Sequence, residues 1–305
     1  MSIIQVEGLR KRYGDLEAVA GISFEVQPGE IFGFLGPNGA GKTTTIEIIE
    51  GYRKADDGQV SVMGMDPASE SREIKERIGI MLQETALYEN LRVIELLQLF
   101  ASYYRCPVDT AGLLEMIGLE EKQRAFIKEL SGGQRQRVVF VLSLINDPEL
   151  IFLDEPTAGL DPQSRRAIWN WVSRAKEEGK TIFLTTHYIE EAESLCDRVA
   201  IIDHGRIIAL DTPKRLMANA DAEQKIAFVI DGSLDIARLE RMPGVSNVLD
   251  DGCGEFTLYA PEVQPILKSL ILQAETNGFA LRGLTVEGAT LEDVFIQLTG
   301  RRIRA

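Results

Sequence analysis

Residues 36–43 read Gly36-Pro37-Asn38-Gly39-Ala40-Gly41-Lys42-Thr43 and fit the pattern G-x-x-x-x-G-K-[ST]. An apolar run, Ile31 to Leu35, precedes them, and a helical pattern from Lys42 to Glu50 follows. A phosphate-binding loop has this position between a strand and a helix, because its glycines let backbone N–H groups curl around phosphate oxygens. Lys42 can then reach the β- and γ-phosphates of a nucleotide, and the Thr43 hydroxyl can ligate Mg²⁺. The alternative is a glycine-rich turn with a solvated lysine.

A second apolar run, Leu150 to Leu153, ends in two acidic residues, Asp154 and Glu155. By itself, an acidic pair at the end of a strand is usually a solvated turn or a helix cap. Beside a phosphate-binding loop, the pair instead favours catalysis. Asp154 would hold Mg²⁺ through water, and Glu155 would orient or deprotonate the attacking water.

A third stretch, Leu130-Ser131-Gly132-Gly133-Gln134, comes immediately before a strongly helical run from Gln134 to Leu144. One interpretation is an N-cap serine followed by a flexible turn. The other is a second anion-binding helix start, in which Ser131 and Gly133 present a hydroxyl and an N–H group to a phosphate.

Together with the loop at 36–43, residues 130–134 resemble the LSGGQ signature of the ATP-binding subunits of ABC transporters. Further elements of that family follow in the family's order. Tyr13 matches the aromatic residue that stacks on adenine, and Gln83 matches the glutamine that joins the Mg²⁺ site to the helical insertion. Residues 158–161 match the loop that crosses the dimer interface, and His187 matches the histidine that contacts the γ-phosphate.

Taken singly, these matches are weak. Tyr13 and Gln83 would more often be ordinary packed or exposed residues, and His187 could equally be a helix-capping or surface histidine. Their order along residues 3–220 makes the resemblance specific.

The resemblance implies ATP and Mg²⁺ as cofactors. It implies that the nucleotide is contacted by Tyr13, Gly36, Pro37, Asn38, Gly39, Ala40, Gly41, Lys42, Thr43, Thr44, Ser131, Gly132, Gly133, Gln134 and Asp161. It implies catalytic roles for Lys42, Gln83, Glu155 and His187, and a metal site made by Thr43, Gln83 and Asp154.

Strand-like and helix-like segments alternate up to about residue 220, which predicts an α/β fold. The resemblance specifies a P-loop NTPase with a mainly parallel core sheet, an antiparallel β subdomain and a helical subdomain at about 90–145. We therefore expect an ATPase cassette over 1–220. After it, residues 221–305 predict a small α+β accessory domain, in which Thr290 and Asp293 form a capping box for the last helix.

The composition limits the partners and the location. The 305 residues include 33 Lys and Arg against 47 Asp and Glu, a formal charge of −14, so we expect no nucleic-acid partner. The densest apolar run, Val138 to Ile145, is far shorter than the ~20 residues that span a bilayer. The N-terminus lacks the pattern of a secretion signal, and the three scattered cysteines suggest a reducing cytosol. We expect a cytoplasmic protein, peripheral on the cytoplasmic face of the cell membrane.

Two stretches indicate a subgroup. Residues 185–193 and 291–301 look like those of export-type bacterial and archaeal ATPases for drugs, lipids or polysaccharides, whose members carry a C-terminal domain of this length. Arg92 and Leu96 depart from the residues that many relatives have there, in a region that faces the membrane subunit in the family.

The resemblance implies an ATP-hydrolysing subunit that drives transport. Two subunits, expected to be identical, would pair head-to-tail around ATP, and a separate multi-span permease would form the membrane part. One alternative is a non-transport ABC ATPase, as in DNA repair or ribosome-associated factors, but such proteins usually carry coiled coils, zinc hooks or two cassettes. Another is a regulatory module without turnover, against which the intact Glu155 and His187 argue.

Overall fold

The computed structural model describes residues 2–82, 86–219, 224–230, 239–250, 254–277, 280–288 and 290–299. The chain divides into two compact units, 1–213 and 214–303. This division falls before the boundary expected at 220, because nearly all of helix α8 (Pro213–Asn219) groups with the C-terminal unit.

A six-stranded sheet forms the centre of the first unit, with the strand order β5-β6-β7-β3-β8-β9. All neighbouring strands are parallel except β8 and β9, which pair antiparallel. Strands β3, β6 and β7 are buried along their whole length, which is typical of a parallel sheet that is covered on both faces. The prediction of a mainly parallel core sheet is therefore confirmed. The strands are β3 (Ile31–Leu35), β5 (Ile78–Met81), β6 (Leu150–Asp154), β7 (Thr181–Thr186), β8 (Arg198–Asp203) and β9 (Arg206–Asp211).

A second, three-stranded antiparallel sheet has the order β2-β1-β4. Its strands are β1 (Ile4–Tyr13), β2 (Leu16–Val26) and β4 (Asp57–Val62). Phe24 of β2 lies 5.4 Å, centroid to centroid, from Phe32 of the core sheet, and Phe32 stacks in turn on Phe183. This shared aromatic core holds the antiparallel sheet against the parallel one, with helix α1 (Lys42–Ile49) contributing Ile46 and Ile49.

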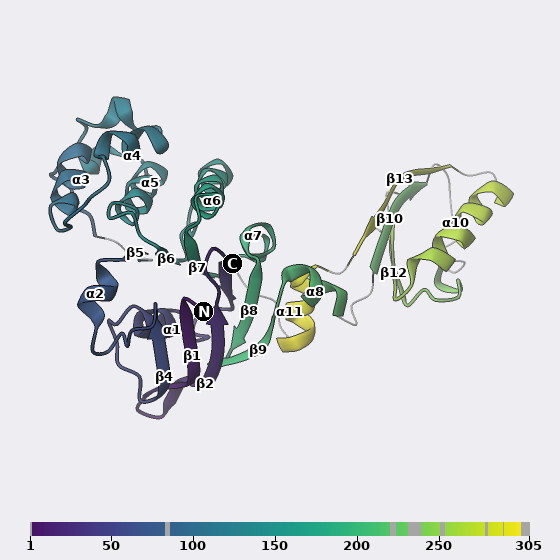
Figure 1. The fold of residues 1–305 in the computed structure, drawn as a ribbon. Coiled ribbons are helices and arrows are strands. Elements are labelled where there is room, and N and C mark those ends of the chain that lie inside the picture. The colour runs from purple at the N-terminus through teal and green to yellow at the C-terminus, as the bar shows by residue number, and fades with distance from the viewer. Residues whose placement is uncertain are drawn as a thin grey trace. The chain divides into compact units, whose positions relative to one another are not determined.

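A helical subdomain has a hydrophobic core of its own, with buried members from Val93 to Ile145. Its main helices are α3 (Val93–Ala101), α4 (Thr110–Met116) and α5 (Gly132–Leu142). Figure 1 shows α3, α4 and α5 grouped together. Leu97, Leu113 and Val138, one from each helix, belong to the buried cluster that joins them. Short helix α2 (Ser71–Lys75) precedes β5.

Two further helices follow strands β6 and β7 of the core sheet. Helix α6 (Pro162–Glu177) begins with proline at its first position, and α7 (Ile189–Leu195) follows β7 directly. Proline is favoured at this position because its missing N–H has no intrahelical partner there in any case.

The C-terminal unit contains an antiparallel sheet in the order β11-β12-β10-β13. Ile266 and Leu270 of helix α10 pack with Phe228 and Leu258 of the sheet. The predicted capping box at the last helix is present: Thr290 Oγ1 accepts from the Asp293 N–H at 3.2 Å, and Asp293 Oδ2 accepts from the Thr290 N–H at 2.9 Å. The elements are β10 (Gln224–Ile230), β11 (Asn247–Asp250), β12 (Glu255–Ala260), α10 (Val263–Asn277), β13 (Leu281–Glu287) and α11 (Leu291–Thr299).

Within the described ranges, none of the helices combines the length and the apolar character that crossing a membrane requires.

Candidate active site

The loop between β3 and α1 has a backbone that requires glycine. Gly39 and Gly41 have φ angles of 80° and 102°, in the region that side chains disfavour. A Cβ atom added to Gly41 would lie 2.3 Å from the carbonyl oxygen of Ala18, so a larger residue would displace the backbone there. Helix α1 begins directly after Gly41, and the N–H groups of its first turn face this loop.

Lys42 points its ammonium group back over the loop. Its side chain is only 4% exposed. The Nζ atom donates to the carbonyl oxygens of Gly36 at 2.7 Å and Pro37 at 3.3 Å, and lies 3.1 Å from Oε1 of Glu155. A buried ammonium group held at a helix N-terminus is suited to bind phosphate.

Asp154 lies at the carboxyl end of β6, between two threonine hydroxyls. Thr43 Oγ1, in the first turn of α1, is 3.3 Å from its Oδ2, and Thr185 Oγ1 donates to its Oδ1. The parallel register pairs Asp154 with Thr185 of β7. Carboxylate and hydroxyl oxygens are ligands that Mg²⁺ prefers.

Glu155 begins the turn after β6 with a φ of 50°, a left-handed conformation that is strained for a residue with a side chain. Its N–H group donates to both the carbonyl oxygen and the hydroxyl of Thr185, each at 3.1 Å. Its Oε2 lies 3.0 Å from Nδ1 of His187, which follows β7. The turn therefore directs the carboxylate between Lys42 and His187.

The two carboxyl groups have opposite pKa shifts. Burial, together with the neighbouring charge of Glu155, raises the pKa of Asp154 in spite of hydrogen bonds from Thr185 and Thr43. Burial would also raise the pKa of Glu155, but the hydrogen bond with His187 and the charge of Lys42 outweigh it and lower that pKa below its usual value. Glu155 is therefore ionised at neutral pH, as a group that accepts a proton from water must be.

Tyr13 lies beside the same loop, at the end of β1. Its ring is 40% exposed, and the Arg53 guanidinium carbon lies 5.3 Å from the ring centroid. Tyr13 lines a pocket of about 280 Å³ with residues that the sequence assigned to the nucleotide. The lining consists of Tyr13, Leu16, Ala18, Asn38, Gly39, Gly41, Lys42, Thr43, Thr44 and Glu155. Ala40, also assigned to the nucleotide, is buried beneath the loop.

These residues fit Mg-ATP. The pocket lining includes both an exposed aromatic ring, which suits a base, and a buried ammonium group, which suits a triphosphate. No group of three or more His, Cys, Asp or Glu able to hold a metal ion exists in the described ranges. Thr43 and Asp154 alone would therefore leave most Mg²⁺ positions to phosphate oxygens and water, the usual arrangement for this ion.

Residues 131–134 contribute nothing to the lining of this pocket in the part of the chain that the structure describes. Ser131 instead caps α5: its Oγ accepts from the Gln134 N–H at 3.2 Å, and Gln134 Oε1 accepts from the Ser131 N–H at 3.0 Å. Both sequence interpretations remain compatible with this geometry, because a capping hydroxyl accepts with its lone pair and keeps a hydrogen to donate. Ser131 and Gly132 are exposed.

Asp161 caps α6, accepting from the N–H groups of Gln163 and Ser164 and from the Ser164 hydroxyl. A Cβ atom added to Gly133 would lie 2.5 Å from that Ser164 hydroxyl oxygen. The start of α5 and the start of α6 therefore pack together in one chain.

Gln83 lies outside the described residues, so its predicted roles stay predictions. Two contacts were missed by the sequence analysis. Thr185 binds Asp154, as described above, and Gln136 of α5 donates to the Pro156 carbonyl oxygen at 2.9 Å. The parallel pairing of two neighbouring strand ends could have indicated Thr185, but nothing local indicates Gln136.

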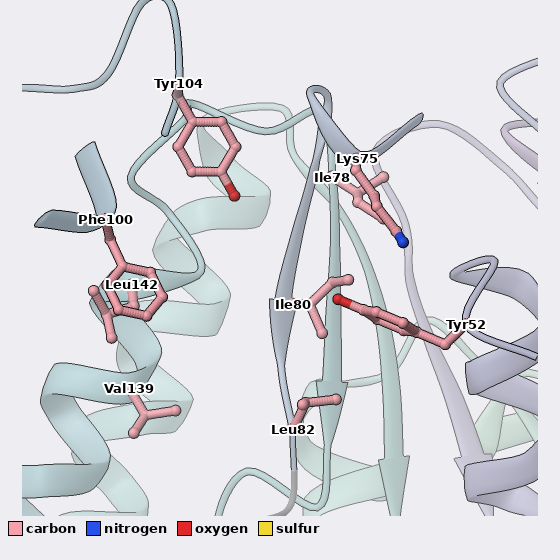
Figure 2. A pocket seen from close by; sticks show the side chains of 9 residues that line it. All are labelled: Tyr52, Lys75, Ile78, Ile80, Leu82, Phe100, Tyr104, Val139 and Leu142. Atoms are coloured by element: carbon pink, nitrogen blue, oxygen red, sulfur yellow. The ribbon is translucent and has the colours of Figure 1, made fainter. Parts of the chain in front are cut away.

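A separate pocket of about 260 Å³ lies between the edge strand β5 and the helical subdomain. Figure 2 shows Phe100, Val139 and Leu142 on one side and Tyr52 with Leu82 on the other. Tyr52 is 58% exposed and carries the Lys75 Nζ atom 4.3 Å from its ring centroid.

Comparison with known proteins gives the family. The family model described as "ABC transporter" matches residues 19–158. The Nod factor export ATP-binding protein I of Ralstonia nicotianae is 42% identical, over 99% of this chain and 95% of that protein. The linearmycin resistance ATP-binding protein LnrL of Bacillus subtilis is 37% identical, over 99% of this chain and 100% of that protein.

Solved structures agree with this assignment. A dimeric ATP-binding cassette bound to ADP and phosphate is 25% identical and has a TM-score of 0.62, covering 68% of this chain and 98% of that one. The predicted P-loop NTPase fold is confirmed by this similarity. The chain therefore belongs to the ABC transporter family, as one of its nucleotide-binding, ATP-hydrolysing subunits.

Proposed function

We propose that the pocket around Lys42 binds Mg-ATP and that Glu155 activates the water that attacks the γ-phosphate. The observation that carries this proposal is the position of the Glu155 carboxylate, which lies between the Lys42 ammonium group and the His187 ring. A carboxylate beside the γ-phosphate position can take a proton from an in-line water.

The neighbouring residues have complementary roles. Lys42 neutralises the β- and γ-phosphates, and Thr43 with Asp154 holds Mg²⁺, which adds further positive charge to the phosphates. Tyr13 stacks on the adenine ring. His187 contacts the γ-phosphate and holds Glu155 in place, and Gln83 connects the metal site to the helical subdomain.

We further propose that two copies of the chain pair head-to-tail around ATP. Residues 131–134 would then bind the nucleotide held by the other copy, and Asp161 would lie at the interface. The exposure of Ser131, Gly132 and Asp161, away from the pocket that their own chain forms, supports this arrangement. The dimeric cassette with ADP and phosphate is a precedent within the family.

The pocket in Figure 2 is the proposed contact for a separate multi-span membrane subunit. Its two walls belong to the core sheet and the helical subdomain, so a partner segment held between them would respond to their relative movement. Exposed Tyr52 and Leu82 supply apolar area for such a contact. The subunit would work on the cytoplasmic face of the membrane.

The names of the relatives support a direction of transport. One is named for Nod factor export and the other for linearmycin resistance, and both match over nearly their whole length. We therefore propose export of a drug-like or lipid-like compound. The comparisons give no support to a role in DNA repair or on the ribosome.

Co-expression with a candidate multi-span membrane protein from the same organism tests the partner proposal. The wild-type chain should be recovered in washed membranes only when the partner is present. Leu82→Glu should reduce this recovery while the purified variant keeps its ATPase rate. Leu272→Glu, at an exposed position of the C-terminal unit, is the matched control. Equal membrane recovery of wild type and Leu82→Glu would contradict this docking site.

A further inference from the structure

Glu191 is a fully buried acidic residue that has no part in the proposed chemistry. It lies on α7 and has no exposed surface. Its Oε1 accepts hydrogen bonds from the Thr157 hydroxyl at 2.9 Å and from the Trp169 indole N–H at 3.0 Å. The Thr186 hydroxyl is near enough to lower the pKa of Glu191, but Oε2 of Glu191 has no hydrogen-bond partner among the described residues.

The two donors, Thr157 and Trp169, and the nearby Thr186 come from three segments that carry site residues. Thr157 belongs to the turn that starts with Glu155. Thr186 ends β7 immediately before His187, and its carbonyl oxygen accepts from the N–H of Gly36 at 3.3 Å. Trp169 lies on α6, the helix that Asp161 caps. A single carboxylate therefore connects the turn of the proposed base, the histidine segment and the helix after the interface loop.

A cation–π contact reinforces the same junction. The Arg165 guanidinium carbon of α6 lies 4.4 Å from the centroid of the Tyr188 ring, next to His187. The charge of Arg165 also favours the ionised form of Glu191. Helix α6 therefore contacts the segment after His187 through two residues one turn apart. Arg165 contacts Tyr188, and Trp169 donates to Glu191.

Burial of this carboxylate has an energetic cost. Burial raises the pKa of Glu191, while the nearby Thr186 hydroxyl and the hydrogen bonds from Thr157 and Trp169 act in the opposite direction. Buried ionisable groups are often replaceable by apolar side chains without loss of stability, so stability alone is a weak reason for their presence. A carboxylate on α7 that accepts from both the Glu155 turn and helix α6 instead fixes a particular geometry.

We propose that Glu191 is a positioning residue for ATP hydrolysis, whose carboxylate holds the Glu155 turn and the His187 segment in a fixed arrangement on helix α6. This inference rests on the proposed roles of Glu155 and His187. A small displacement of a reacting group lowers the rate by up to about 10²-fold. Binding of ATP should be unaffected, because neither Thr157 nor Trp169 lines the Lys42 pocket in the described part of the chain.

The first test compares two substitutions of Glu191. Gln keeps an oxygen that accepts from Thr157 and Trp169, whereas Leu keeps only the volume. We expect Glu191→Leu to lower kcat by between about tenfold and 10²-fold, with KM for ATP within about twofold of wild type. Glu191→Gln should recover most of kcat. Equal losses in both variants would overturn positioning through these hydrogen bonds.

Single-donor variants keep the test valid if Glu191→Leu does not fold. Thr157→Val and Trp169→Phe each remove one hydrogen bond, so each should lower kcat by part of the Glu191→Leu effect. Trp171→Phe is the matched control, because Trp171 stacks on Phe140 and contacts the helical core. Wild-type kcat in both Thr157→Val and Trp169→Phe would overturn the proposal.

A spectroscopic measurement separates the inference from the proposed chemistry. In the Trp171→Phe background, Trp169 supplies the single indole N–H resonance of the chain. Adding Glu191→Leu should move this resonance upfield, because its carboxylate acceptor is lost. Adding Glu155→Gln should leave it nearly in place while abolishing turnover.

If Glu155→Gln hydrolyses ATP normally, the proposed base is wrong. If Glu155→Gln is inactive but the Glu191 and single-donor variants keep wild-type kcat, the positioning role alone is wrong.

Discussion

The Lys42 ammonium group and the Glu155 carboxylate form an ion pair, with Nζ 3.1 Å from Oε1 and both side chains at most 5% exposed. The P-loop lysine and the proposed base thus neutralise each other in a buried site. A triphosphate bound at residues 36–43 competes with Glu155 for this ammonium group. When the nucleotide binds, its phosphates should therefore replace Glu155 as the partner of Lys42. The Glu155 carboxylate can then act on water.

Tyr13→Ala should weaken the binding of ATP and ADP to a similar extent, because stacking on adenine does not depend on the γ-phosphate. Stacking of an aromatic side chain on a base contributes about 1–3 kcal/mol in related contexts. Tyr13→Phe keeps the ring and should bind nearly as wild type. Isothermal titration with both nucleotides checks this, and unchanged affinity in Tyr13→Ala would remove Tyr13 from the nucleotide site.

Ser131→Arg should leave nucleotide binding by the single chain nearly intact and abolish ATP-dependent pairing and turnover. The arginine would occupy the position that the phosphates of the other copy require. Ser131→Ala is the control for the lost helix cap, which is worth about 1 kcal/mol. Light scattering with Mg-ATP measures the mass of each variant and so shows whether Ser131→Arg and Ser131→Ala form dimers. The head-to-tail arrangement would be contradicted if Ser131→Arg still formed dimers with Mg-ATP. It would also be contradicted if this variant lost nucleotide binding by the single chain but still formed dimers.

Glu50, at the C-terminal end of α1, gives a prediction on pH. Its carboxylate is 1% exposed, and neither oxygen has a hydrogen-bond partner among the described residues. Burial, together with the nearby charges of Asp154 and Glu47, raises the pKa of Glu50 from 4.5 to about 8, although Lys75 acts in the opposite direction.

The folded chain therefore keeps a proton on Glu50 that the unfolded chain releases between pH 4.5 and about 8. Stability should fall as pH rises through this window. Glu50→Gln removes this titrating group. The difference in the free energy of unfolding between Glu50→Gln and wild type should therefore be about 3 kcal/mol more favourable to the variant at pH 7 than at pH 4. Urea unfolding at several pH values measures this, with Glu73→Gln, at an exposed residue of α2, as control. Parallel pH profiles for wild type and Glu50→Gln would show that Glu50 does not titrate as described.

Removal of residues 214–305 tests whether the first unit is an independent cassette. All residues that line the nucleotide pocket precede this cut, and the first unit contains its own aromatic core. We expect the truncated chain to fold with one cooperative transition and to bind ATP as wild type does. A loss of ATP affinity would show that the C-terminal unit contributes to the site.

Short-range patterns were sufficient to predict the centre of the site. A glycine-rich loop after a strand places Lys42, and an apolar run ending in two acids places Asp154 and Glu155. Because parallel strands end at one edge of a sheet, the proximity of these groups follows from the alternation of strands and helices. Asp161 could also be identified as a helix cap, since it precedes a proline and a helical pattern.

Contacts between distant segments could not be predicted in this way. The hydrogen bond from Gln136 to Pro156 and the connections of Glu191 depend on how helices α5, α6 and α7 pack on the sheet. The two interpretations of Ser131 also could not be separated, because a helix cap and a phosphate contact require the same residue at the same place. The boundary expected at about 220 was drawn where the alternation of strands and helices ends, and that pattern carries no information on which unit α8 packs with.

The central claim is that Glu155 is the base for hydrolysis, and Glu155→Gln tests it most directly. Gln is nearly isosteric, so the fold and ATP binding should be kept, while loss of the charge should slow hydrolysis by at least about 10²-fold. Loss of repulsion against the triphosphate should also stabilise the ATP-bound pair. Lys42→Ala, by comparison, should lose nucleotide affinity itself.

The measurement is size-exclusion chromatography of Glu155→Gln with and without Mg-ATP, together with the hydrolysis rate of the same sample. We predict a stable dimer that appears only with Mg-ATP and hydrolyses it at least about 10²-fold more slowly than wild type. A variant that stays monomeric with Mg-ATP, or that turns over at the wild-type rate, would contradict the assignment of Glu155 as the catalytic base.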